Sequence, residues 1–483
     1  MINDFDDPNR QLLPRWVPFL ESHLYYPSKG FSRKTNEIEL FDFKKTISDW
    51  DKFHTLPLAG EIIARAHYSE ITDIPAYQEA LDFILEDGNY LSTNPFLLSI
   101  LNKPNDPDEK KVIHNLKKEI QYNYSPSLYV DLAYYYEKLG QSKKAKKAID
   151  IACKLNPNNP YLIRYIARFF ILEKKIDEAL YVLTKNDNLN NNPLIISAEI
   201  SISEANNYKS KLLRKGHSII KKENISSQYE NELFATFGTL EFNNGNSKKG
   251  KKLILQSLIV PNENILAQAR YLMTKFQKEI SIDNVIVPNR FEADTWIAYN
   301  KKDFEKVIEQ SRHWFYFQPF SASPAIMNTY INSLIFEKEN ESIEMAQKAL
   351  KISKDVFSLQ NNLVVAACRS NQIELANKEF KKLQTYTIKE TIDKDVLLAT
   401  CGLLDYRNGN YELGRKKYEE AILNFERAKD YEKMARCLYF FGCEIKNAKE
   451  NDYDKIIAQS KELAERYKYS EIQAAINKNF KGI

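Results

Sequence analysis

The sequence predicts an all-α protein built as a solenoid of helix–turn–helix repeats. A pattern of large and small apolar residues recurs along it with a period of 34 residues. Glycine is scarce, at 13 of 483 residues, so the glycine-rich loops of a nucleotide-binding α/β enzyme are not expected. Tyrosine and phenylalanine are abundant, at 29 and 26 residues, as expected where stacked helices pack through bulky side chains.

The clearest repeat spans residues 126–157 and reads PSLYVDLAYYYEKLGQSKKAKKAIDIACKLNP. Two helical stretches flank a short polar turn at Gly140, and Ser125 followed by Pro126 is a favourable helix start. Counted from Pro126, large apolar residues fall at positions 4, 7 and 11, and small ones at positions 8, 20 and 27. These residues are Tyr129, Leu132 and Tyr136, and Ala133, Ala145 and Ala152.

Further repeats follow in the same phase. The next begins 34 residues later at Pro160, a degenerate one covers 193–222, and a fourth begins near Asn231 with glycines in place of the small alanines. After an irregular stretch at 279–291, repeats resume near residues 287, 323, 357 and 395. The last helical pair is expected at 431–447 and 453–466.

These positions resemble the tetratricopeptide repeat, a 34-residue helix–turn–helix unit. The resemblance implies a right-handed α-solenoid with a first block at 121–278, a second at 279–466 and a capping helix at 467–483. Residues 1–120 match it only faintly: helices are predicted at 41–54, 56–68 and 75–86, after an irregular start of about 35 residues.

Composition predicts a cytoplasmic protein with no membrane segment. The start, MINDFDDPNRQ, lacks the apolar core of a signal peptide, and no run reaches 18 apolar residues. The five cysteines show no CxxC spacing and are interpreted as buried free thiols in a reducing compartment. A net charge of +4 does not by itself indicate nucleic acid.

No catalytic residue, metal site or cofactor is predicted. Gly245, Gly250 and Lys251 match a phosphate-binding loop, but Lys252 stands where Ser or Thr must ligate Mg²⁺, and no strand precedes. The six histidines show no ligand spacing with each other or with cysteine. An unrecognised enzyme is the alternative, and no motif supports it.

The resemblance implies that a partner protein or peptide binds in the concave groove, which positions 2, 5, 9, 12 and 13 of the first helices line. The candidate groove residues are Tyr134, Tyr161, Arg164, Arg168, Asn361 and Asn362. Arg164 and Arg168 share one helix face and would grip a carboxylate, or else form ion pairs within the solenoid. Asn361 and Asn362 would bond either a peptide backbone or the neighbouring repeat.

A basic ridge is the second candidate surface. Lys143, Lys144, Lys146 and Lys147 occupy the same repeat positions as Lys248, Lys249, Lys251 and Lys252. On the convex side these lysines would contact phosphates or an acidic partner, or simply form a solvated helix face.

The sequence therefore predicts a non-enzymatic scaffold or sensor subunit that binds a protein or peptide. Its Lys-, Ile- and Asn-rich composition suggests a bacterial gene, and the resemblance suggests a part in a two-gene system such as phage defence. Two alternatives stay open. One is a peptide-gated regulator in which residues 1–120 are the effector and 126–466 the sensor, and the other is nucleic-acid binding along the basic ridge at 143–252.

Overall fold

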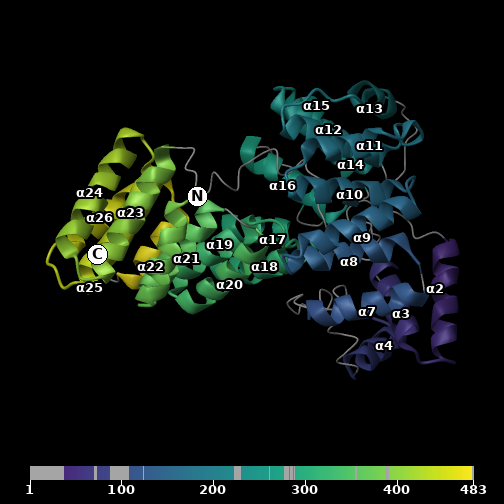
Figure 1. The fold of residues 1–483 in the computed structure, drawn as a ribbon, viewed down its shortest axis with the longest axis horizontal. Helices are drawn as coiled ribbons and strands as arrows, with labels where there is room; N and C mark the ends of the chain where they lie inside the picture. The colour runs from purple at the N-terminus through teal and green to yellow at the C-terminus, as the bar shows by residue number, and fades with distance from the viewer. Residues whose placement is uncertain are drawn as a thin grey trace. The chain divides into compact units, whose positions relative to one another are not determined.

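The computed structural model describes residues 37–69, 73–86, 108–122, 124–221, 230–259, 261–276, 282, 285, 287, 289–353, 356–386 and 391–480. These residues form helices and turns and contain no strand. Consecutive helices pair and stack, so the α-solenoid of tetratricopeptide-like repeats is confirmed (Figure 1). The irregular start predicted for the first 35 residues lies outside the described residues. None of the described helices combines the length and apolar character needed to cross a membrane.

The chain divides into two compact units, each described by itself. The first comprises Met1–Ala293 and Tyr316–Phe320, and the second Asp294–Phe315 and Ser321–Ile483. The predicted block boundary at residues 278 and 279 stays a prediction.

The first unit is built from the following helices: α2 (Glu37–Trp50), α3 (Leu56–Ser69), α4 (Pro75–Glu86), α7 (Glu109–Tyr122), α8 (Pro126–Lys138), α9 (Ser142–Leu155), α10 (Pro160–Leu172), α11 (Ile176–Thr184), η2 (Asp187–Leu189), α12 (Pro193–Ala205), α13 (Leu213–Ile220), α14 (Asn231–Asn243), α15 (Ser247–Ser257) and α16 (Glu263–Phe276). Helices α17 (Phe291–Asn300) and α18 (Phe304–Phe317) lie mostly in the second unit.

The second unit continues with α19 (Ser323–Ile331), the π-helix η3 (Asn332–Phe336), α20 (Glu339–Ile352), α21 (Phe357–Arg369), α22 (Ile373–Gln384), α23 (Thr391–Arg407), α24 (Tyr411–Arg427), α25 (Tyr431–Asn447), α26 (Tyr453–Tyr467) and α27 (Ser470–Asn479).

Helices α2 to α4 enclose a small core of their own. Trp50 is fully buried and its ring stacks on His54 at 4.3 Å between ring centroids. Ile62, Ile63 and Ile84 fill the space around it. This part of the chain therefore does not share the main core of the repeats that follow.

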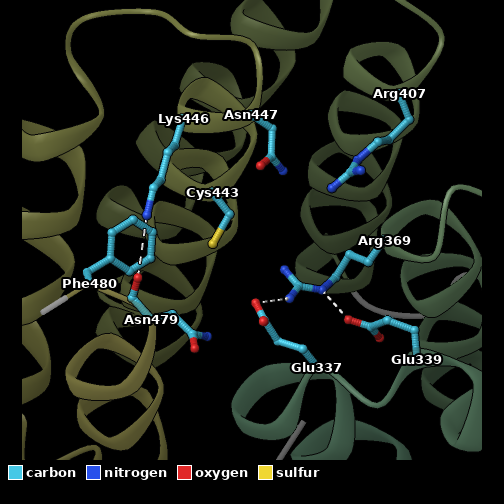
Figure 2. Close-up of a pocket in the computed structure, with 9 residues that line it drawn as sticks. All are labelled: Glu337, Glu339, Arg369, Arg407, Cys443, Lys446, Asn447, Asn479 and Phe480. Atoms are coloured by element: carbon cyan, nitrogen blue, oxygen red, sulfur yellow. Dashed lines mark hydrogen bonds and ion pairs between the residues drawn. The ribbon is translucent and has the colours of Figure 1, made fainter.

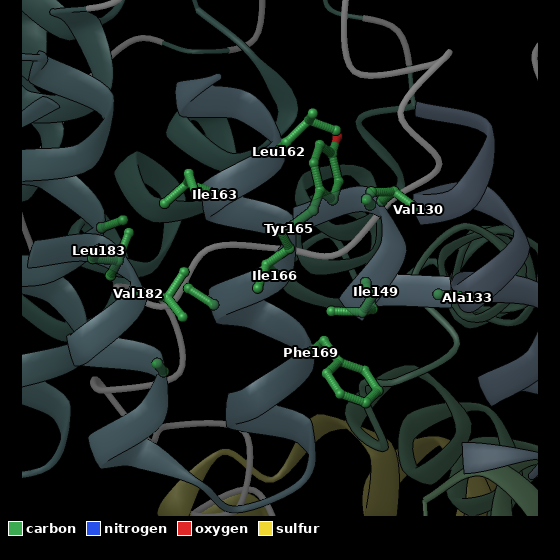
Figure 3. Packing of buried hydrophobic residues seen from close by; sticks show 14 of the residues in the cluster. Val130, Ala133, Ile149, Leu162, Ile163, Tyr165, Ile166, Phe169, Val182 and Leu183 are labelled. Atoms are coloured by element: carbon green, nitrogen blue, oxygen red, sulfur yellow. The ribbon is translucent and has the colours of Figure 1, made fainter. Parts of the chain in front are cut away.

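The repeat pattern creates the main core of the first unit. Ala133, Ala145 and Ala152 are completely buried, so the paired helices α8 and α9 approach closely. Ile149 of α9 and Ile166 of α10 fill the layer between successive repeats (Figure 3). Large residues thus pack between repeats, and small ones let the two helices of one repeat touch.

In the fourth repeat, glycine instead of alanine lets the two helices approach closely. A Cβ atom on Gly250 would lie 2.7 Å from the Phe242 ring and 3.0 Å from the carbonyl oxygen of Gly238. A Cβ atom on Gly238 would lie 2.8 Å from Ile254. Helices α14 and α15 are therefore closer than an alanine pair permits.

The first helix of each repeat ends at a residue with left-handed backbone. Gly140, Gly245 and Gly409 have φ of 68°, 82° and 84°. They occupy position 15 of their repeats, and Asn371 with φ 61° and Glu337 with φ 56° take the same position in theirs. A left-handed residue reverses the chain within a turn of a few residues.

In the second unit, hydrogen bonds join helices that are far apart in the sequence. Arg436 of α25 donates to the Tyr330 hydroxyl of α19 at 2.9 Å, and the Tyr439 hydroxyl donates to the Leu334 carbonyl of η3 at 3.2 Å. Helix α27 packs against α25, α26 and η3. Its apolar residues Ile472, Ala475 and Ile476 are buried, so α27 belongs to the core of this unit.

The cysteine prediction is confirmed only in part. All five cysteines are free, but only Cys368 and Cys437 are buried. The other three, Cys153, Cys401 and Cys443, are half-buried.

Candidate functional site

The predicted groove residues of the first unit lie on α8 and α10. Tyr134 is buried and packs edge-on against Phe320, with 5.2 Å between ring centroids. Arg164 forms an ion pair with Glu232 of α14, and Asn262 donates to the other oxygen of that carboxylate at 2.8 Å. Arg168 is half-buried, and Tyr161 stands on α10 with its side chain outside the described ones. Partner binding by these residues stays a prediction.

The two predicted asparagines link successive repeats of the second unit. Asn362 donates to the Thr329 hydroxyl at 2.9 Å, and Asn361 accepts from Thr400 at 2.7 Å. The hydrogen bonds thus join α21 to α19 on one side and to α23 on the other. Contact of the asparagines with a partner likewise stays a prediction.

Several first helices are buried on every face. All residues of α12 from Leu194 to Ser203, and all nine residues of α19, are buried. A helix lining an open groove would instead expose a stripe of side chains every three or four residues. At these two helices the inside of the solenoid is filled by the protein itself.

The lysines of the predicted ridge are exposed in two places. Lys143, Lys144, Lys146 and Lys147 lie on α9, and Lys248, Lys249, Lys251 and Lys252 lie on α15. Along the chain and in Figure 1, α11 falls between them, and its outer face carries exposed Asp177 and Glu178.

The second unit contains a polar pocket of about 470 Å³, which we call the Arg369–Arg407 pocket (Figure 2). Residues of α20, α21, α23 and α25 line it, together with Glu337 at the end of η3 and the C-terminal end of α27. Its lining residues are Glu337, Glu339, Arg369, Arg407, Cys443, Lys446, Asn447, Asn479 and Phe480.

Repeat geometry explains how three cations reach one pocket. Arg369 and Arg407 end α21 and α23 and both occupy position 13 of their repeats. Lys446 lies in the last turn of α25, the next first helix. Successive first helices lie side by side, so their C-terminal ends meet, and the helix dipole favours cations at that end.

Each pocket arginine forms an ion pair with a buried carboxylate. Arg369 donates to Glu339 at 2.6 Å, and these two side chains are 7% and 9% exposed. Arg407 donates from Nη2 to Glu444 at 2.6 Å, and the Glu444 side chain is 2% exposed. The guanidinium groups are thereby oriented before any ligand arrives.

Helix α27 supplies the opposite wall. The ammonium of Lys446 lies 4.5 Å from the centroid of the Phe480 ring and donates to the Asn479 carbonyl at 3.5 Å. The Asn479 amide donates to the Tyr439 hydroxyl at 2.8 Å. The pocket therefore depends on the seat of α27 against α25.

Burial shifts the pKa of three groups at or beside the pocket. Burial raises the pKa of Glu339 and of Glu444, although their arginine partners oppose the rise. Burial also raises the pKa of the Cys443 thiol to about 11. Cys443 therefore stays protonated near neutral pH and is a poor nucleophile. Within the described part of the chain, no three His, Cys, Asp or Glu side chains gather in a way that would hold a metal ion.

The pocket is not predicted from the sequence, although part of its signal is present there. Position 13 belongs to the concave set, and Arg369 and Arg407 stand there in consecutive repeats. Nothing in the repeat pattern indicates Asn479 or Phe480, because they follow the last helical pair and reach the pocket only through the packing of α27.

Comparison with known proteins gives distant structural likenesses. No protein-family model and no curated protein matches the chain. The chain is similar to a solved structure titled human IFIT1 dimer with PPP-AAAA, at 13% identity and a TM-score of 0.32, covering 93% of this chain and 99% of that chain. It is also similar to yeast Tom70, at 12% identity and a TM-score of 0.29, covering 76% of this chain and 91% of that chain. The fold assignment rests on the repeats of the chain itself.

Proposed function

We propose that the chain is a non-enzymatic binding scaffold and that the Arg369–Arg407 pocket holds part of a partner protein or peptide. The observation that carries this proposal is the meeting of Arg369, Arg407 and Lys446, from three successive first helices, in one pocket. The amides of Asn447 and Asn479 add groups that both donate and accept, which suits a peptide backbone. Because the arginines are already oriented, little ordering cost opposes binding.

Capture of partners from the native cells tests this proposal. Lys446 and Asn447 are exposed, so Lys446→Glu with Asn447→Asp changes the charge of the rim at two solvent-facing side chains. Lys416→Glu, on the exposed face of α24, is the matched control. We expect one dominant partner to fall at least about tenfold with the pocket variant and to stay with the control. A partner retained by the pocket variant would contradict the pocket as the binding site.

The predicted groove contacts Tyr134, Tyr161, Arg164, Arg168, Asn361 and Asn362 are part of the same proposal. Arg168→Glu, at a half-buried side chain of α10, is the variant that tests them. Loss of a captured partner with Arg168→Glu supports a contact at α10 in the first unit. A partner that this variant retains would contradict a contact there.

The cellular setting belongs to the proposal too, and its support is the composition and the resemblance to tetratricopeptide-repeat proteins. We place the chain in a cytoplasmic bacterial system of two or more genes, such as phage defence. Deleting this gene and a neighbouring gene singly should then give the same loss of protection under phage challenge. Unaltered protection in both deletions would contradict this setting.

A second candidate function, nucleic-acid binding, is favoured by the charge around α13 and α15. Residues 208–221 and 244–259 carry nine Lys and Arg side chains and no Asp or Glu. Since the whole chain has a net charge of only +4, the remainder is net acidic. Both helices pack on α14, where Gly216 and Gly250 allow close contact with Phe237 and Phe242. The positive charge is thus gathered on one side of the first unit.

Salt titration of a fluorescent single-stranded oligonucleotide tests this candidate. Neutralised phosphates release counterions, so log affinity should fall linearly with log salt concentration. Lys215→Glu, Lys248→Glu and Lys252→Glu together should abolish binding. The same change at Lys143, Lys144 and Lys147 should have less effect, because α11 separates α9 from α13. A salt-independent affinity, or equal loss with both triple variants, would contradict an interface centred on α13 and α15.

The peptide-gated regulator remains the alternative form of the scaffold proposal. The separate core around Trp50 supports an effector segment within residues 1–120. Small-angle scattering that shows compaction on peptide binding would favour it, and an unchanged radius would contradict it.

A further inference from the structure

Arg369 has two carboxylate partners of different kinds. Glu339 is 9% exposed and accepts from Nε at 2.6 Å. Glu337 is 56% exposed and accepts from Nη2 at 3.3 Å. The first contact is short and buried, and the second is long and open to solvent. Both are drawn as dashed lines in Figure 2.

The charges of the pocket show what Glu337 does there. Arg369 with Glu339, and Arg407 with Glu444, form two neutral pairs. The remaining charged groups of the lining are Lys446 and Glu337, which are one cation and one anion. With Glu337 in place the pocket is neutral, and without it the pocket carries one positive charge.

The backbone at Glu337 is left-handed, as it is at the corresponding turn of the other repeats. Glu337 follows the π-helix η3 and has φ 56°, at repeat position 15. Among the described residues with positive φ, the others are glycine, lysine and asparagine. Left-handed backbone is unfavourable for a non-glycine residue other than Asn or Asp. From this turn the Glu337 carboxylate reaches the Arg369 guanidinium and accepts a hydrogen bond from it.

We propose that Glu337 is a built-in competitor that occupies the oxyanion position of the Arg369–Arg407 pocket until a ligand displaces it. This inference rests on the proposed function of the same pocket. The ligand group is a carboxylate or a phosphate, whose oxygens accept from Arg369 Nη2 and pair with Lys446. Asn447 and Asn479 then contact the atoms next to that group.

Burial decides which carboxylate leaves. Glu339 would have to carry its charge out of a site that is almost closed to water, and Arg369 would lose its short hydrogen bond. Glu337 already has more than half of its side chain in solvent, so rotation away from Arg369 changes its hydration little. Ligand binding therefore exchanges one acceptor on Nη2 and leaves the buried pair intact.

Affinity measurements on the full chain test whether Glu337 competes with a ligand for Arg369. The probes are a fluorescein-labelled tetraglutamate peptide, followed by anisotropy, and inorganic phosphate, followed by titration calorimetry, both at low ionic strength. Glu337→Gln removes the competing charge. Glu344→Gln removes the same charge from α20 at a side chain that is 70% exposed and paired with Lys348, and is the control.

We expect Glu337→Gln to bind more tightly than the unaltered chain by about two- to fivefold, the range of an exposed ion pair. Glu344→Gln should leave the affinity unchanged. Tightening for the peptide alone identifies a carboxylate ligand, and tightening for phosphate as well identifies any oxyanion. Each supports the proposal.

The opposing outcomes distinguish a wrong role for Glu337 from a wrong binding site. If the unaltered chain binds a probe and Glu337→Gln binds it equally or more weakly, Glu337 is not a competitor, while the pocket remains a binding site. If neither probe binds to any variant, the oxyanion ligand is wrong. The pocket as the partner's binding site fails separately, if the captured partner is retained by the Lys446→Glu, Asn447→Asp variant.

Discussion

At the scale of single residues, the turn that ends each first helix follows most directly from the sequence. Gly140 was visible as the turn of the clearest repeat, and the structure gives it φ 68°. At the same repeat position, Asn371 and Glu337 adopt this backbone without being glycine. The backbone conformation is therefore set by the repeat, and glycine only lowers its cost.

At Gly245 the cost of left-handed backbone for a non-glycine residue can be measured separately from packing. Gly245 has φ 82° and nothing lies within 4 Å of a Cβ atom placed on it, so Gly245→Ala adds backbone strain without a clash. We expect a loss of about 1–2 kcal/mol, measured as a shift of the urea midpoint of the first unit. Asn244→Ala, in the same turn but with φ −80°, is the control. An equal effect of both substitutions would show that the left-handed backbone is not what destabilises Gly245→Ala.

At the scale of helices, the sequence predicted the elements better than their distant contacts. The last pair was expected at 431–447 and 453–466 and is found at Tyr431–Asn447 and Tyr453–Tyr467. The helix expected at 41–54 instead spans Glu37–Trp50. The repeat fixes each helix against the next repeat, but the contact of Arg436 with Tyr330 spans 106 residues. That contact depends on rotations accumulated over three repeats, which the pattern does not contain. The pocket was missed for the same reason.

Helix α27 carries a pH dependence that can be measured. Burial raises the pKa of Glu471, Glu432 raises it further, and Arg436 and the Tyr299 hydroxyl lower it. The folded state therefore holds this proton more tightly than the unfolded state does. Stability from this group is full below the ordinary glutamate pKa and is lost as pH rises through the raised pKa. We expect Glu471→Gln to gain stability relative to the unaltered chain, and to gain more at pH 7.5 than at pH 5.

Urea midpoints of both proteins at the two pH values give the answer. The comparison between variants is needed because burial lowers the pKa of His313 in the same unit. The stability that neutral His313 contributes is lost as pH falls below the ordinary histidine pKa, so its effect on stability has the opposite sign to that of Glu471. The two pH values are both above the range in which Asp430 and Asp452, whose pKa values are lowered, respond. An equal difference between the two proteins at both pH values would show that Glu471 does not titrate as its burial implies.

At the scale of the whole molecule, the division into two compact units predicts how the chain unfolds. A solenoid is stabilised by contacts between neighbouring repeats, so cooperativity weakens where these contacts thin out. Ile149 of α9 and Ile457 of α26 are both completely buried, one in each unit. Truncating either to alanine should cost about 2–5 kcal/mol through the cavity that is left. We expect each substitution to lower the urea midpoint of its own unit and to leave the other unchanged.

Hydrogen exchange with mass spectrometry in increasing urea assigns each transition to its peptides. If a single transition covers both units and both substitutions shift it equally, the two units fold as one cooperative body, and a ligand in the Arg369–Arg407 pocket would then stabilise the first unit as much as the second.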